Sequence, residues 1–200
     1  MAGDERRRQI LKVAMHLFSE NGFSGTTTKK IAEAAGVSEA MVFKHFENKG
    51  ELYADILDHK ACSLGFEEPF REIADEMERK VDFGVFFGMA HNALRHHEED
   101  KDFIRLLLHS ALENHELARM FFESYVTGMY EVMSKYIRQR QEDGAFRKME
   151  PKVVIRAIVG MMIHHSLSNS LWDKEQKVLK ISNEEAAREF AGILLDGIKK

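Results

Sequence analysis

Side chains that can bind phosphate oxygens are concentrated between residues 26 and 49 of this sequence. Thr28 stands at the expected start of a helix, where a hydroxyl group and free backbone N–H groups suit an anion. Lys49 stands at the expected start of another helix and adds a positive charge, and His45 supplies a donor between them. Each residue alone can be explained as a capping or solvent-exposed side chain. Together the three predict contact with phosphate groups.

Two short helices joined by a tight turn are needed to position these donors. The sequence predicts them over residues 27–35 and 38–43. Ala32 is small enough for a close helix crossing, and Gly36 can adopt the left-handed conformation that ends the first of the two helices. Val42 is apolar and can pack back on that helix. This spacing is typical of a helix-turn-helix, whose second helix can lie in the major groove of DNA.

Base edges are expected to be read from the exposed side of the second helix. Lys44 can donate to guanine, and Ala40 or Met41 can touch a thymine methyl group. The residues expected to contact DNA lie on this helix or at the start of a neighbouring helix. They are Thr28, Ser38, Glu39, Ala40, Met41, Phe43, Lys44, His45 and Lys49.

Apolar residues recur at helical spacing along the whole chain, which predicts an all-α protein. The first helix is expected over 5–20, with Ile10, Ala14, Leu17 and Phe18 buried and Asn21-Gly22 ending it. Asn48 is expected to cap a fourth helix. The remaining helices are predicted over 69–79, 82–96, 100–114, 116–142, 151–172 and 183–200, the last opening with a capping box at Ser182.

Composition indicates a globular protein rather than a disordered or membrane-spanning one. Hydrophobic residues make up 44% and charged residues 31% of the 200 positions, and no apolar run approaches the roughly 20 residues of a membrane span. The single cysteine, Cys62, excludes an internal disulfide and suits a reducing cytoplasm. Residues 1–50 carry a net charge of +2 and the remainder −6, as expected of a small DNA-binding part on a larger body.

Catalysis is not expected, because the chain lacks a glycine-rich phosphate loop, a nucleophile elbow and a convincing acid–base pair. No cofactor is expected either. Ten histidines, among them His96-His97 and His164-His165, raise the alternative of a metal site. Their spacing does not give the ligand pattern of a zinc site, so a histidine in an apolar pocket is the preferred interpretation.

The stretch from Arg6 to Ile56 resembles the N-terminal domain of the TetR family of transcriptional repressors. The resemblance rests on Ile10-Leu11, Ala14, Phe18, Asn21-Gly22-Phe23, Thr27-Thr28, Ile31-Ala32, Ala35-Gly36-Val37-Ser38, Phe43, His45-Phe46, Asn48-Lys49 and Glu51-Leu52. Phe43 departs from the tyrosine and Lys44 from the aromatic residue that many relatives carry, so the operator sequence does not follow from the family.

The resemblance implies a helix-turn-helix domain over 1–48 and a larger helical ligand-binding and dimerisation domain over 49–200. It implies a cytoplasmic regulator that binds palindromic operator DNA as a homodimer, is released by a small apolar or amphipathic effector, and has no membrane partner. The Phe- and Met-rich C-terminal part suits such an effector, although these residues can equally form a core. The residues expected around it are Phe86, Phe103, Leu107, Phe121, Tyr125, Met129 and His165.

Dimerisation is expected through the last two long helices. The segment Val153 to Ile163 is apolar nearly all round, so one side can bury in its own domain and another elsewhere. The residues expected at the interface are Ile155, Val159, Met162, Phe190, Ile193, Leu194 and Ile198. A monomer with a large core is the alternative here. For the whole chain the alternatives are a helical interaction protein and a constitutive DNA-binding protein without an effector.

Overall fold

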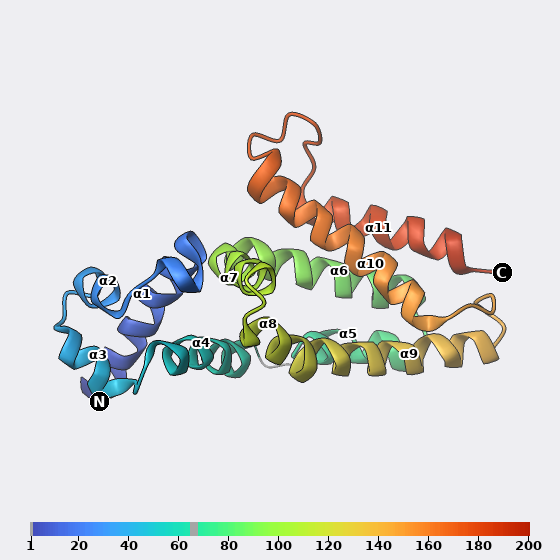
Figure 1. Ribbon diagram of the computed structural model, residues 1–200. Helices are drawn as coiled ribbons and strands as arrows, with labels where there is room; N and C mark the ends of the chain where they lie inside the picture. The colour runs from blue at the N-terminus through green and yellow to red at the C-terminus, as the bar shows by residue number, and fades with distance from the viewer. Residues whose placement is uncertain (1, 65–67) are drawn as a thin grey trace. The chain divides into compact units, whose positions relative to one another are not determined.

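Helices are the main elements of the computed structural model shown in Figure 1. It describes residues 2–64 and 68–200, and their side chains except at positions 2, 57–64, 68–70, 117 and 124, so Cys62 lies outside the described side chains. Within these ranges the only β-type pairing is an isolated bridge between Phe146 and Lys199. The expectation of an all-α protein is confirmed. No helix among the described residues is both long and apolar enough to cross a membrane.

The N-terminal helices are α1 (Ala2–Gly25), α2 (Thr28–Ala34), α3 (Glu39–His45) and α4 (Lys49–Leu64). The helices that follow are α5 (Glu68–Glu78), α6 (Asp82–Glu99), α7 (Lys101–Leu112), α8 (Glu116–Phe121), α9 (Thr127–Glu142), α10 (Pro151–Leu167) and α11 (Asn183–Ile198). Two π-helical segments, η1 (Phe122–Val126) and η2 (Ser168–Trp172), follow α8 and α10.

The chain divides into two compact units. The first unit combines Met1–Leu64 with Asp100–Ser124, and the second combines Gly65–Glu99 with Tyr125–Lys200. Helices α7 and α8 therefore pack with the N-terminal helices, although some 35 residues of the other unit separate them in sequence. These units describe packing, and the expected functional domains over 1–48 and 49–200 stay a prediction.

Helix α1 supplies the centre of the first unit. Ile10, Ala14 and Phe18 are fully buried, as expected, and α1 packs against α4 and α7. The predicted end of this helix is a break rather than a stop: Gly22 has a φ of 69°, after which helical structure resumes to Gly25. A β-carbon at Gly22 would lie 2.2 Å from a carboxylate oxygen of Glu113, so both the conformation and the close approach favour glycine.

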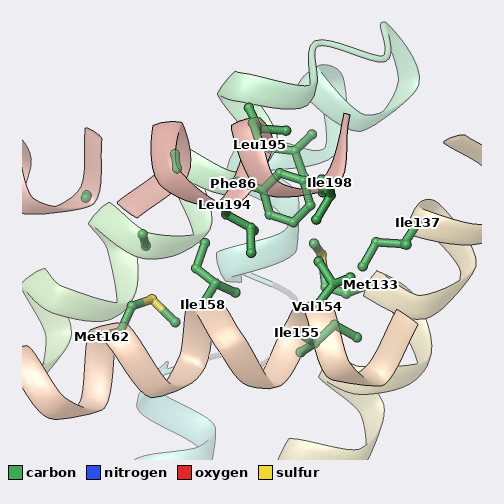
Figure 2. Close-up of a cluster of buried hydrophobic side chains, with 14 of the residues drawn as sticks. Phe86, Met133, Ile137, Val154, Ile155, Ile158, Met162, Leu194, Leu195 and Ile198 are labelled. Atoms are coloured by element: carbon green, nitrogen blue, oxygen red, sulfur yellow. The ribbon is translucent and has the colours of Figure 1, made fainter. Parts of the chain in front are cut away.

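The core of the second unit is formed by apolar side chains of α6, α9, α10 and α11. Figure 2 shows them converging: Phe86 from α6, Met133 and Ile137 from α9, Val154, Ile155, Ile158 and Met162 from α10, and Leu194, Leu195 and Ile198 from α11. Each of these side chains is at most 6% exposed, which marks a closely packed core. The α10 helix begins at Pro151, where helices tolerate proline.

Two long helices predicted from periodicity are interrupted by π-helical turns. The segment predicted over 116–142 contains η1, which ends in Val126 and is followed by Thr127 and Gly128, all weak helix formers. The segment predicted over 151–172 ends in η2, where the Ser170 hydroxyl donates to the carbonyl of Ser166 at 2.6 Å. Such side-chain bonds to the backbone compete with regular helical pairing.

A half-buried histidine links two helices of the second unit. Nδ1 of His97, in α6, lies 2.9 Å from the hydroxyl oxygen of Ser166, in α10. Burial, with a smaller contribution from neighbouring His96, lowers the pKa of His97 from 6.5 to about 4. The ring is therefore neutral in the folded protein at pH 7.

Acidification should destabilise the fold through His97. Between pH 6.5 and 4 the unfolded chain binds a proton at this position and the folded chain does not, so stability falls as the pH falls. Going from pH 7.5 to 5.0 should cost about 2 kcal/mol at this residue. Urea unfolding at both pH values should show a smaller loss in His97→Gln than in the parent. An equal loss in both proteins would contradict the assignment.

Candidate nucleic-acid interface

The turn between α2 and α3 has the geometry that the sequence predicts. Gly36 has a φ of 64°, and the backbone N–H of Val37 donates to the carbonyl of Ala32 at 3.0 Å, which closes the end of α2. Ala32 and Val42 are 3% and 1% exposed, so both pack inward. A side-chain amide of α1, from Gln9, also donates to the Ala35 carbonyl at 2.9 Å. These contacts hold α2 and α3 to each other and also to α1.

Both helices begin with the predicted side-chain caps. The hydroxyl of Thr27 accepts the backbone N–H of Lys30 at 3.2 Å, and that of Ser38 accepts the N–H of Met41 at 3.2 Å. These caps place the start of each helix at a defined residue. The start of α4 is fixed in the same way, since Asn48 accepts the N–H of Glu51 at 2.9 Å.

Helix α3 presents the predicted base-reading residues to solvent. Ser38, Glu39, Ala40, Phe43 and Lys44 are exposed, and Met41 and His45 are half-buried. Phe43 is 49% exposed, so α3 also presents an apolar ring to solvent beside Lys44. Lys44 makes no hydrogen bond or ion pair with any residue that the structure describes, so its charge is available to a partner.

The hydroxyl of Thr28 does not stand free at the start of α2. It donates to the carboxylate of Glu39, at the start of α3, over 2.6 Å. This bond places a negative charge beside the hydroxyl that was predicted to meet a phosphate. An approaching phosphate group must therefore displace Glu39 from Thr28, and the displaced carboxylate would face the groove.

The ammonium group of Lys49 holds the loop between α1 and α2. It donates to the carbonyls of Phe23 and Thr26 at 2.7 and 2.9 Å and lies 4.0 Å from the centre of the Phe23 ring. Two of its three N–H donors are thereby used within the protein. One remains for an external anion, so Lys49 can fix the start of α2 and also contact a phosphate.

A group of rings supports this loop and was not foreseen from the sequence. Tyr53, in α4, packs against Phe18 at 4.7 Å and Phe23 at 5.0 Å between ring centres. His115, from the turn after α7, packs on Phe23 at 4.3 Å and on Tyr53 at 4.6 Å. Burial raises the pKa of Tyr53 to about 12, so the phenol stays protonated. Glu113 adds a bond by accepting the N–H of Phe23 at 3.1 Å.

The residues predicted around an effector fall in both units. In the first unit Phe103 packs edge-on against Phe121 at 5.8 Å, and Leu107 is half-buried. In the second, Tyr125 and Met129 are half-buried, Phe86 belongs to the core, and His165 packs edge-on against Phe190 at 5.7 Å. A shared effector site for these seven residues stays a prediction. Among the described residues, no three His, Cys, Asp or Glu side chains form a group that could hold a metal ion.

The residues predicted at a dimer interface differ in exposure. Ile155, Met162, Leu194 and Ile198 belong to the core of the second unit, as Figure 2 shows. Val159 and Phe190 are half-buried, whereas Ile193 is 61% exposed. The same two helices expose further apolar side chains that the sequence did not single out, notably Val153 and Ile163 on α10. Apolar all-round patterning could not tell which side of α10 faces its own core.

The segment that contains the helix-turn-helix matches a known protein family. Residues 10–56 match the model of the family described as bacterial regulatory proteins, tetR family. AcrR of Shigella flexneri, an HTH-type transcriptional regulator, is 39% identical over 61 residues, which are 30% of this chain and 28% of AcrR. This chain therefore matches less than a third of that relative's length.

Two similarities extend over nearly the whole chain. YhgD of Bacillus subtilis, an uncharacterized HTH-type transcriptional regulator, is 26% identical over 184 residues, 88% of each chain. The structure of AibR in complex with isovaleryl coenzyme A and operator DNA superimposes with a TM-score of 0.71 over 95% of this chain and 98% of that one, at 19% identity, and so shares the fold. Residues 10–56 therefore match the helix-turn-helix part of the tetR family of bacterial regulatory proteins, and nearly the whole chain shares the fold of solved structures that include a putative TetR-family regulator from Mesorhizobium loti.

Proposed function

We propose that this chain is a cytoplasmic, ligand-responsive repressor that binds a roughly palindromic operator as a homodimer. The observation that carries the proposal is the exposed face of α3, held on a helix-turn-helix whose turn and caps are fully formed. Phe43 and Lys44 on this face are both exposed, so each is available to a partner. A helix presented in this way suits the major groove, where Lys44 can donate to guanine.

Contacts to the phosphate backbone would come from the helix starts on either side of α3. Thr28 offers its hydroxyl once Glu39 is displaced, and Lys49 offers its third N–H. His45, half-buried at the end of α3, offers a ring nitrogen. These contacts would set the register of the protein on the duplex without reading sequence. Sequence would be read by α3, with Glu39 able to accept from the amino group of cytosine and Met41 able to touch thymine.

Selection from random duplex DNA at low salt should recover a palindrome. The two half-sites should lie about one helical turn apart, roughly 10 base pairs, or somewhat more, because two recognition helices must enter grooves on one side of the duplex. Met41→Ala should shift the selected bases while leaving total DNA affinity within about threefold. Recovery of no palindrome from the parent protein would contradict the operator proposal.

A second copy of the chain is the proposed occupant of the exposed faces of α10 and α11. Val153, Ile163 and Ile193 are 57%, 43% and 61% exposed, so both helices leave apolar side chains available to a partner. Ala157 and Gly192, on the same helices, are small enough to let partner helices approach closely. Pairing these faces about a two-fold axis would give a four-helix interface.

A lysine at Ile193 should separate the two copies. Light scattering should give twice the 23.1 kDa of one chain for the parent and a single chain for Ile193→Lys. Val132→Lys is the matched control, because Val132 is 41% exposed on α9, away from the proposed interface. Leu194→Lys is unsuitable, since that side chain is buried in the chain's own core. A parent protein that runs as a monomer at micromolar concentration would overturn the dimer.

The effector proposal rests on the family and on the ring- and Met-rich C-terminal segments. The structure of AibR contains an acyl thioester together with operator DNA, so one structural neighbour binds both kinds of partner. In this chain an apolar or amphipathic effector would favour a state in which α4 is displaced. Because Lys49 at the start of α4 bonds to the loop before α2, such a displacement would move the helix-turn-helix and change the separation of two recognition helices.

Operator release should be measured against acyl chains, acyl thioesters of coenzyme A and aromatic compounds. At least one class should weaken operator binding, and saturating operator should weaken that compound's binding by the same factor, because the coupling is reciprocal. Phe103→Ala should reduce the response more than Leu112→Ala, a change at a side chain that is 82% exposed. Operator binding that no class affects would leave the alternative of a constitutive DNA-binding protein. Absence of operator binding altogether would favour a helical interaction protein.

A further inference from the structure

The second unit contains a pocket of about 580 Å³ at the C-terminal end of α10. Its wall is formed by α10, by η2, by the segment over 173–179 and by Phe190 of α11. A volume of this size suits one small organic molecule, since ligand pockets in proteins span roughly 300 to 1,000 Å³. Of the residues predicted around an effector, His165 lies on this wall.

Aromatic rings form much of the pocket wall. Trp172, at the end of η2, is 67% exposed although it is the largest side chain in the chain. Its ring centre lies 6.0 Å from that of His164, and on the opposite helix Phe190 packs edge-on against His165. Met161 and Leu179 complete the apolar lining. An exposed tryptophan on such a wall offers a flat stacking surface that nothing described covers.

Among the described residues, no lysine or arginine lines the wall, and the carboxylate on it, that of Asp173, is already hydrogen-bonded within the protein. The Asp173 carboxylate accepts the backbone N–H groups of Lys177, Val178 and Leu179 at 2.7, 2.9 and 3.3 Å, which folds this segment onto the wall. His165 is paired with the side-chain amide of Asn169 at 3.1 Å. Burial lowers the pKa of His165, and neighbouring His164 adds to the shift, so the ring is neutral at pH 7. An anionic ligand would lose hydration here without gaining a lysine or arginine partner.

We propose that this pocket binds an uncharged, planar aromatic molecule, with its rings against Trp172 and Phe190. Stacking on these side chains would supply the affinity, and the neutral imidazole and amide groups would accept or donate single hydrogen bonds at the edge of the ligand. The π-helical turn that carries Trp172 is itself a type of segment that often occurs at functional sites. The proposal does not depend on DNA binding, and it shares only His165 with the residues predicted around an effector.

Calorimetric titration with 2-naphthol tests the pocket directly. Two related probes test its chemistry: 2-naphthoate keeps the rings and adds a charge, and 1-octanol keeps the hydroxyl and removes the rings. We expect 2-naphthol to bind at least about tenfold more tightly than either. Binding should also quench or shift the fluorescence of Trp172, the only tryptophan in the chain. Equal or tighter binding of 2-naphthoate or 1-octanol, or no binding of 2-naphthol, would overturn the proposal.

A variant that fills the pocket provides the structural test. Gly160 lines the wall, and a β-carbon there would meet no atom within 4 Å, so Gly160→Leu should fold, with a better helix former in α10. It should lose 2-naphthol binding by at least about tenfold. Gly128→Leu is the matched control, because Gly128 is equally open but lies on α9 outside the pocket. Unchanged binding by Gly160→Leu would contradict the site.

A second copy of the chain is the alternative to a small ligand as the occupant of this pocket. The variant Ile193→Lys distinguishes these two occupants. If the pocket belongs to one chain, this variant should bind 2-naphthol as the parent does. Binding that appears in Ile193→Lys but is absent from the parent would mean that a partner chain covers the pocket, and it would overturn the ligand proposal.

Discussion

Two backbone carbonyls, one in the last turn of α1 and one between α1 and α2, depend on one ammonium group. The carbonyls of Phe23 and Thr26 both accept from Lys49, which begins α4 and lies over the Phe23 ring. An unpaired carbonyl in this half-buried segment would cost about 1–3 kcal/mol. The turn after α7 supports the same segment, since Glu113 accepts the Phe23 N–H and His115 packs on its ring. The orientation of the helix-turn-helix therefore depends on three segments that are distant in sequence, all within the first unit.

The helix-turn-helix could be predicted because its determinants are local. A small residue, a glycine and an apolar residue at fixed spacing define the crossing and the turn, and Ala32, Gly36 and Val42 take these roles in the structure. Hydroxyl caps at Thr27 and Ser38 likewise depend only on the next three residues. The all-α class followed from the same kind of information, namely helical periodicity along the chain.

What the sequence could not predict depends on long-range packing. No local pattern indicates that His115 meets Phe23 and Tyr53, or that Glu39 bonds to Thr28. The side of α10 that faces the core was also undetermined, because that helix is apolar nearly all round, and Ile155 proves to be buried. The positions of the π-helical turns depend on competition between side-chain and backbone hydrogen bonds, which periodicity does not report.

We propose that the exposed face of α3 and the ammonium group of Lys49 contact DNA. The most direct measurement is the salt dependence of binding to a duplex for the parent, Lys44→Met and Lys49→Met. Each substitution should make the slope of log affinity against log salt shallower by about two, because a bound homodimer carries two copies of each lysine at the DNA. Lys49→Met should also lower the free energy of unfolding by about 1–3 kcal/mol, and Lys44→Met should not. Slopes that both variants leave at the parent value would contradict the claim.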